Sequence, residues 1–190
     1  MSYKLITAPT VEPVLLADAK WHCRIDGADD DALTTALIVA AREQAEHETG
    51  RALCTQTWEL ILDAFPDECT LRNAPVQSIT SVKYLDVAGV EQTLNLADTL
   101  LDKDSEPGRL LPAYGKTWPD TYPVANAVRV RYVCGYGAAA AVPQSVKSWM
   151  LLAIGTMYAQ RETMVSGQVA ALPDRFWHRL LDAHRIYEAC

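Results

Sequence analysis

The pattern of hydrophobic and polar positions changes its period twice along this chain of 190 residues. Apolar residues recur at helical spacing from Pro13 to about Leu53 and again after Pro143, whereas they alternate with polar residues over about 56–134. Recurrence every three or four residues is typical of amphipathic helices, and alternation is typical of half-buried strands. The pattern therefore predicts helical segments on both sides of a β-rich one.

Two helices are predicted in the N-terminal segment. The first follows Pro13 and carries its apolar residues up to Cys23. The aspartates at 29–31 supply an N-cap and first-turn acids for the second helix, and Gly50 is suited to its C-terminal stop. The apolar face expected for this second helix consists of small and aliphatic side chains that allow close helix contact, namely Leu33, Ala36, Leu37, Ala40, Ala41 and Ala45.

The middle of the chain reads as strands and turns. Trp58, Leu60 and Leu62 alternate with Thr57, Glu59, Ile61 and Asp63, and further on Val128, Val130 and Tyr132 alternate with Arg129 and Arg131. The signals between these two patterns are a hairpin (Thr80–Leu85 and Val90–Leu94 around Val87–Gly89), a turn at Ser105–Gly108 and a long proline-containing loop at Pro112–Pro123.

Two further helices are predicted in the C-terminal segment, one beginning at Pro143 and one running from Pro173 to the C-terminus. The predicted fold class is therefore α+β. It is mainly a helical bundle, with two N-terminal and two C-terminal helices and an inserted β-rich segment. We expect a single domain over 1–190, with its helical part at 13–53 and 143–189 and the β-rich insertion at about 56–134.

Composition and charge narrow the possible functions. A hydrophobic fraction of 49% and a charged fraction of 22% exclude global disorder. The net charge of -7 argues against affinity for DNA gained through phosphate contacts. The five cysteines contain no C-x-x-C pair, so reduced thiols in a cytosolic protein are expected. No signal peptide and no membrane span are predicted.

No motif indicates catalysis. Gly135–Ala140 matches G-x-G-x-x-A, but Pro143 starts the helix too late for a dinucleotide site, so a strand-to-helix turn is the better interpretation. Glu43 and His47 share a helix face without forming H-E-x-x-H. Ser145 lies outside any G-x-S-x-G context. We therefore expect no catalytic residue, no metal and no cofactor.

Several residues are candidates for an interface instead. Arg129 and Arg131 share one face of a strand, which favours a solvated or interface surface. Trp118 lies in the proline-containing loop, where it either tucks back onto the domain or is offered to a partner. Arg109, which follows the turn at Glu106–Gly108, is the fourth candidate.

The order of segments resembles the phage and prophage head–tail connector (adaptor, neck) proteins. The resemblance spans nearly the whole chain, and the ordered set is more specific than any one piece. Its segments are Leu16–Asp26, Asp30–Leu33, Glu48–Leu53, Gln56–Leu60, Pro75–Tyr84, Glu106–Arg109, Arg129–Gly137 and the helix after Val142–Pro143 with Tyr158 and Arg161–Glu162 near its end. The chain departs from the usual pattern at Cys134, where a small residue such as Ala is commoner, and at its Cys190 end.

The resemblance implies a structural protein of the virion head–tail junction, made in the bacterial host cytoplasm. It implies a closed ring of about twelve copies under the portal protein that extends the DNA channel and offers a platform to a downstream neck or tail-completion protein. We expect the isolated protein to be monomeric or weakly associating and to assemble on the portal. Double-stranded DNA is passing cargo only. By analogy, the last helix and tail dock to the portal, which makes interface candidates of Arg179, Arg185, Ile186 and Tyr187.

Two alternatives remain at this stage. One is another phage neck or tail-completion protein, and the other is a small cytosolic enzyme that uses His47 or His184. For a ring, the acidity suggests a further hypothesis, because acidic side chains that face the lumen would let DNA slide. The acids considered for this role are Asp29–Asp31, Glu46, Glu48, Asp102, Asp104 and Glu106.

Overall fold

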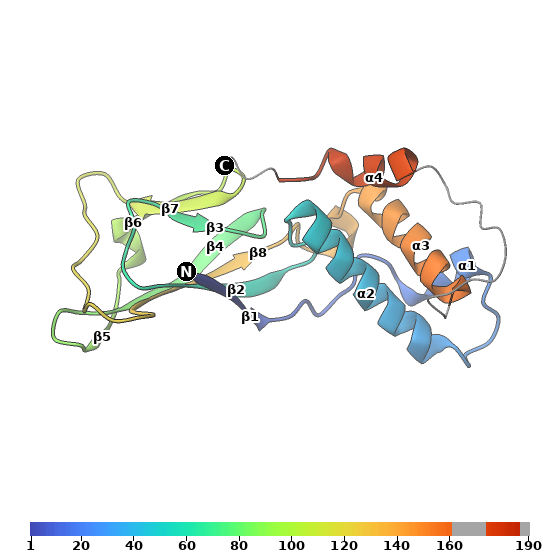
Figure 1. The fold of residues 1–190 in the computed structure, drawn as a ribbon, viewed down its shortest axis with the longest axis horizontal. Helices are drawn as coiled ribbons and strands as arrows, with labels where there is room; N and C mark the ends of the chain where they lie inside the picture. The colour runs from blue at the N-terminus through green and yellow to red at the C-terminus, as the bar shows by residue number, and fades with distance from the viewer. Residues whose placement is uncertain (161–173, 187–190) are drawn as a thin grey trace. The chain divides into compact units, whose positions relative to one another are not determined.

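The computed structural model describes residues 1–160 and 174–186, and in these ranges the chain forms four α-helices and eight strands (Figure 1). It divides into two compact units. The β-rich unit consists of Met1–Thr10 and Thr55–Tyr136, and the helical unit consists of Val11–Cys54 with the described residues from Gly137 onward. The prediction of a mainly helical bundle is therefore wrong, because eight strands in two antiparallel sheets make up a unit of their own.

The β-rich unit contains a five-stranded and a three-stranded antiparallel sheet. The larger sheet has the order β1-β2-β8-β4-β5, and the smaller sheet has the order β3-β7-β6. The strands of the larger sheet are β1 (Ser2–Thr7), β2 (Gln56–Leu62), β8 (Val128–Cys134), β4 (Val76–Leu85) and β5 (Glu91–Thr93). Those of the smaller sheet are β3 (Cys69–Leu71), β7 (Gly108–Pro112) and β6 (Thr99–Asp102).

The core of the β-rich unit lies between its two sheets. Leu60, Val130 and Val82 are in register across β2, β8 and β4, and all three are fully buried. Two tyrosines of the larger sheet reach the backbone of β3 and the residue after it: the Tyr3 hydroxyl donates to Thr70 O at 2.9 Å, and the Tyr132 hydroxyl donates to Arg72 O at 3.0 Å. The alternation predicted for β2 and β8 thus turns alternate residues toward the smaller sheet.

The helical unit contains α1 (Leu16–Cys23), α2 (Asp31–Thr49), α3 (Gln144–Ala159) and α4 (Asp174–Asp182). A short 3-10 turn at Ala139–Ala141 precedes α3, and another at Leu96–Asp98 belongs to the β-rich unit. The predicted stop of α2 is confirmed, since Gly50 takes a left-handed conformation with φ 68° and its N–H bonds to Glu46 O. The predicted stripe on α3 is buried at Val146, Trp149, Met150, Ala153 and Ile154.

The buried face of α2 is rotated from the predicted one. Ala41 and Ala45 are buried as expected, but Leu33, Ala36 and Ala40 are exposed, and Thr34, Ile38, Arg42 and Thr49 take their places in the core. The reason is the burial of Arg42, whose charge finds partners in the interior. An apolar pattern alone does not reveal such a paired charge.

Two other boundaries differ from the prediction. Strand β1 precedes the first helix, and no strand was predicted there because Leu5 and Ile6 interrupt the alternation of apolar and polar residues. The last helix ends at Asp182 instead of running to the C-terminus, because Ile186 N–H bonds to Thr49 O and draws the chain to the end of α2. The predicted start at Pro173 lies outside the described residues.

Candidate interaction surfaces

The outward face of the larger sheet carries the arginine pair predicted on β8. Arg131 lies in register with Glu59 of β2, and its Nη2 and Nε donate to Glu59 Oε1 at 2.9 Å and 3.3 Å. Arg129 Nη1 lies 3.7 Å from Glu59 Oε2. The Glu59 side chain is 7% exposed, whereas those of Arg129 and Arg131 are 52% and 42% exposed. One sequestered carboxylate therefore holds two half-exposed guanidinium groups.

Trp118 tucks back onto the β-rich unit. Its ring stacks on Phe65 with 4.7 Å between centroids and an interplanar angle of 6°, and Phe65 in turn meets the edge of Tyr84 at 5.8 Å. The indole N–H donates to Asp67 O at 3.4 Å. The aromatic cluster anchors the long loop between β7 and β8, which the sequence predicted as irregular.

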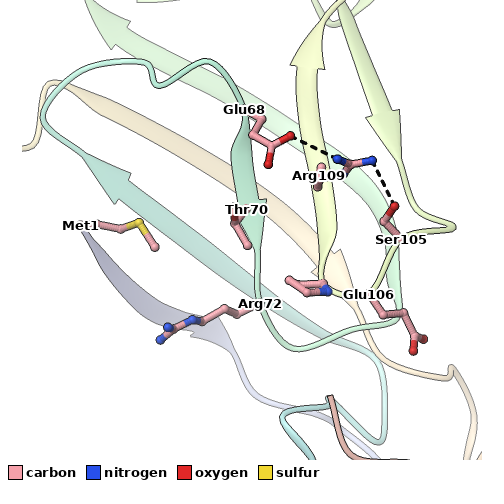
Figure 2. Close-up of a pocket in the computed structure, with 8 residues that line it drawn as sticks. Met1, Glu68, Thr70, Arg72, Ser105, Glu106 and Arg109 are labelled. Atoms are coloured by element: carbon pink, nitrogen blue, oxygen red, sulfur yellow. Dashed lines mark hydrogen bonds and ion pairs between the residues drawn. The ribbon is translucent and has the colours of Figure 1, made fainter. Parts of the chain in front are cut away.

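Arg109 lies on β7 at the rim of a hollow of about 540 Å³ on the smaller sheet (Figure 2). Its Nη2 donates to Asp102 Oδ2 at 2.7 Å and its Nη1 to Glu68 Oε2 at 3.3 Å. Hydrogen bonds from Ser105 and from Arg109 lower the pKa of Asp102 to about 2. The hollow is lined by Met1, Glu68, Thr70, Arg72, Ser105, Glu106, Pro107 and Arg109.

The segment after α4 is fastened within the helical unit. Arg185 Nη2 donates to Glu48 Oε2 at 2.8 Å, and Ile186 lies against Gly50 at the end of α2. Arg179 is exposed on α4, and Tyr187 lies outside the described residues. Two of the four candidates proposed for portal docking therefore already make contacts inside the chain.

A second ion cluster is buried in the helical unit. Arg42, with a side chain 7% exposed, donates from Nε to Glu12 Oε2 at 2.9 Å and from Nη1 to Glu46 Oε2 at 2.8 Å. Glu46 Oε1 also accepts the N–H of Leu53 at 2.8 Å. Burial raises the pKa of Glu12, and Arg42 opposes that shift. The cluster ties the segment before α1 to α2 and to the chain beyond it.

Sequence reasoning did not single out the two most exposed aromatic residues of the described ranges. Trp21 on α1 is 86% exposed, and Tyr114 stands fully exposed at a turn in which Lys116 N–H bonds to Ala113 O. Gly115 takes φ 73° in this turn, and Lys116 Nζ pairs with Asp98 at 2.8 Å. The sequence signal for this turn is Gly115, which directly follows Tyr114 in a predicted loop, because glycine favours turns and the residue beside it then lies at the surface.

Ser145 and His184, two of the residues considered for catalysis, lie side by side in the helical unit. Ser145 Oγ lies 2.9 Å from His184 Nε2, and the His184 carbonyl accepts Arg51 Nε at 2.5 Å, so this histidine joins α3 to the segment after α2. Burial raises the pKa of Cys54 to about 11 and that of Cys69 to about 12, which disfavours the thiolate of either. No group of three or more metal-ligating side chains occurs within residues 1–160 and 174–186.

In the described ranges, no helix combines the length and the apolar character that a membrane crossing requires.

Comparison with known proteins identifies a similar family. A family model described as phage gp6-like head–tail connector protein matches residues 14–100. A search of curated proteins gave no match.

Solved structures match along the whole chain. A chain from the neck of an empty gene transfer agent particle, computed with C6 symmetry, has a TM-score of 0.82 at 25% identity and covers 100% of this chain and 98% of its own. A chain from the virion of the native particle gives 0.80 at 26% identity, and one from its neck, computed with C12 symmetry, gives 0.76 at 26%. Both cover the same shares of the two chains.

The family match covers β2, β3 and β4 as well as the two N-terminal helices, so it includes parts of both units. The structural matches extend the similarity over the remaining sequence. Together these comparisons confirm the predicted resemblance to phage head–tail connector proteins and support a structural connector role for the chain.

Proposed function

We propose that the chain is the adaptor of a tailed phage or prophage, forming a closed ring under the portal protein. The ring extends the DNA channel and gives the next neck or tail-completion protein its platform. The observation that carries this proposal is the whole-chain similarity, at a TM-score of 0.82, to a chain from the neck of a gene transfer agent particle. The fold that matches from end to end is the basis for a structural role.

The symmetry of the related neck supports a ring of about twelve copies. The matched neck structures were computed with C6 and C12 symmetry. A cyclic ring uses head-to-tail contacts, so each copy presents two different surfaces. We expect the isolated chain to be monomeric and to assemble on the portal.

The portal contact is assigned to α4 and the segment that follows it. Arg179 is exposed there, whereas Arg185 is held by Glu48 and Ile186 by Thr49. Arg179 and Tyr187 are therefore the residues that we assign to the portal contact, and Tyr187 lies outside the described residues.

The acidic balance bears on the DNA channel. Of the acids considered for the lumen, several are already engaged within the chain: Asp30 by Tyr158, Asp31 by Lys20, Glu46 by Arg42, Glu48 by Arg185 and Asp102 by Arg109. Asp29 and Asp104 are exposed and have no ion pair with another described residue. We therefore assign the repulsion of passing DNA to these two and to the net charge of -7.

Negative-stain imaging of the purified protein mixed with its portal tests the proposal. The expected result is a new ring layer on one face of the portal, absent from images of the portal alone and of the protein alone. A stable small dimer that leaves the portal bare would contradict it. Binding to isolated tails and not to portals would instead identify a tail-completion protein.

A further inference from the structure

Cations gather on the outward face of the larger sheet. β1, β2, β8 and β4 lie side by side in this sheet (Figure 1). The residues that alternate with the buried Leu60, Val130 and Val82 point away from the smaller sheet. Four of the 17 basic residues of the chain lie there, in two adjacent cross-strand rows. We call this surface the basic face, defined by Lys4, Lys83, Arg129 and Arg131.

The two arginines of the basic face share one carboxylate. Arg131 Nη2 donates to Glu59 Oε1 at 2.9 Å, whereas Arg129 Nη1 lies 3.7 Å from Glu59 Oε2. Both arginine side chains are about half exposed. An arginine that is already held in place loses little conformational freedom on binding, and its planar donors suit the oxygens of an anion such as phosphate. Glu59 therefore orders two guanidinium groups and neutralises only one charge.

The two lysines of the basic face differ in their partners. Lys83 Nζ donates to Glu91 Oε1 at 2.8 Å. Lys4 is exposed and forms no ion pair with another residue of the described ranges. Four cations are thus matched by two carboxylates, Glu59 and Glu91. The basic face carries an excess of two positive charges, although the chain as a whole has a net charge of -7.

The neighbours of these cations are hydroxyl side chains. Ser2, Ser81 and Thr93 lie in the same two rows. None of the large apolar side chains that are exposed in the described ranges lies in these rows. A protein partner usually binds through buried aromatic or aliphatic anchors. The phosphates of DNA are instead contacted by Arg, Lys, Ser and Thr side chains. The composition of the basic face is therefore that of a surface for phosphate groups.

We propose that the basic face contacts the phosphate backbone of double-stranded DNA, mainly through Lys4, Arg129 and Arg131. The proposal rests on the proposed function, in which DNA passes through the ring, and it adds the surface by which each copy meets that DNA. Phosphate contacts carry no sequence information, so DNA of any sequence is bound equally. Because only two positive charges are in excess and the rest of the chain is acidic, each contact is weak and the DNA slides past it.

Binding of a labelled duplex to the isolated chain tests the proposal. The probe is a duplex of about 20 base pairs, and fluorescence anisotropy follows its binding from about 50 mM salt upward. The Lys4→Ala/Arg129→Ala variant should bind about tenfold more weakly at low salt and lower the salt slope by about two. Arg24→Ala/Lys103→Ala removes the same charge at exposed positions outside the basic face and should leave most of the affinity intact.

A gain of affinity supplies a second measurement. Glu59→Gln removes the carboxylate that Arg129 and Arg131 share, so it should tighten binding of the duplex severalfold. Asp26→Asn removes one negative charge from an exposed loop of the helical unit and should change the affinity much less. Equal gains from the two variants would show that the net charge acts without a defined surface, and would overturn the proposal.

A labelled peptide of about ten glutamates tests the rival occupant, an acidic protein surface. The expected result is that the chain binds the duplex and that any binding of the peptide is weaker. A chain that binds the peptide and not the duplex would assign the basic face to a protein. That result would overturn the proposal, and so would a duplex affinity unchanged by Lys4→Ala/Arg129→Ala.

The measurements separate failure of this inference from failure of the proposed function. Duplex binding is measured on the isolated chain, whereas the proposed function is tested by ring formation on the portal. The Lys4→Ala/Arg129→Ala variant should still form rings in normal yield. If the unmodified protein forms no ring, the connector proposal fails. If it forms rings but the substitutions on the basic face leave duplex binding unchanged, only this inference fails.

Discussion

The two units of this chain use charged side chains in different ways. In the helical unit, the Arg42 side chain is 7% exposed and pairs with Glu12 and Glu46, whose side chains are 25% and 16% exposed. In the β-rich unit, Glu59 is equally buried, but the arginines it binds remain half exposed. A cluster whose cation is buried, as at Arg42, stabilises the fold. A cluster whose cations are half exposed, as at Glu59, is also available to a partner.

The helical cluster should be the more sensitive of the two to mutation. Arg42→Ala leaves two partly buried carboxylates without their cation, which should cost about 3 kcal/mol of unfolding free energy. Urea denaturation measures this loss. Arg24→Ala, at an exposed position of the same unit, is the control and should change the unfolding free energy by less than about 0.5 kcal/mol.

The Arg42→Ala variant should also acquire a pH dependence. Burial raises the pKa of Glu12, and the variant lacks the cation that opposes this shift. The folded variant then binds a proton at Glu12 more readily than the unfolded chain does. Its stability should therefore fall as the pH rises above about 4.5. A variant equally stable at pH 5 and pH 7 would contradict this account.

The aromatic anchor of the β-rich unit should come next in size. Trp118→Ala removes the stacking on Phe65 and the bond to Asp67 O, at a cost of about 2 kcal/mol. Trp118→Phe keeps a ring in place and should recover about half of this loss in the same denaturation experiment. If neither variant changes stability, the loop is held by other contacts.

Removing the charge of Glu59 should lower the stability of the fold less than it changes the affinity for DNA. Glu59→Gln removes the charge that orders Arg129 and Arg131, but both arginines can turn to solvent, so we expect a loss of about 1 kcal/mol. The affinity for a DNA duplex should change more clearly than thermal stability. A loss of stability as large as that of Arg42→Ala would remove the contrast between the two units.

The smallest effect is expected at the Asp102 turn. Its lowered pKa, about 2, means that the ionised carboxylate stabilises the fold above its unfolded pKa near 4, and that this contribution is lost as the pH falls toward 2. The Asp102→Asn variant should therefore be less stable than the unmodified protein at pH 6, and this difference in stability should disappear as the pH falls toward 2. Urea midpoints at pH 6, 4 and 3 measure this convergence.

Local sequence signals predicted much of the secondary structure. The alternation at Trp58–Leu62 and Val128–Tyr132, the stripe from Val146 to Ile154 and the glycine after α2 each correspond to an observed element. Short strands such as β3 and β6 were not predicted, because three or four residues are too few to establish an alternating pattern. The fold class was wrong for that reason.

The surfaces were predicted less well than the elements. Arg129 and Arg131 were recognised as one strand face, but their partner Glu59 lies 70 and 72 residues away in the chain and becomes their neighbour only through the pairing of β2 with β8. The hollow beside Arg109 was not predicted, since Met1, Glu68 and Arg109 come together only in the folded β-rich unit. Trp118 was left open between two roles, and its contact with Phe65 decided between them.

The sequence by itself determined the order of helices and strands and the resemblance to connector proteins, because periodicity and motif order are properties of neighbouring residues. Only the tertiary structure decided that the β-rich segment forms a two-sheet unit, that α2 buries Arg42 in place of its alanines, and that Arg185 holds the tail to Glu48. These outcomes depend on pairs such as Glu12–Arg42 and Glu48–Arg185, which are far apart in the chain. The energy of such a pair arises only when folding removes both charges from water together.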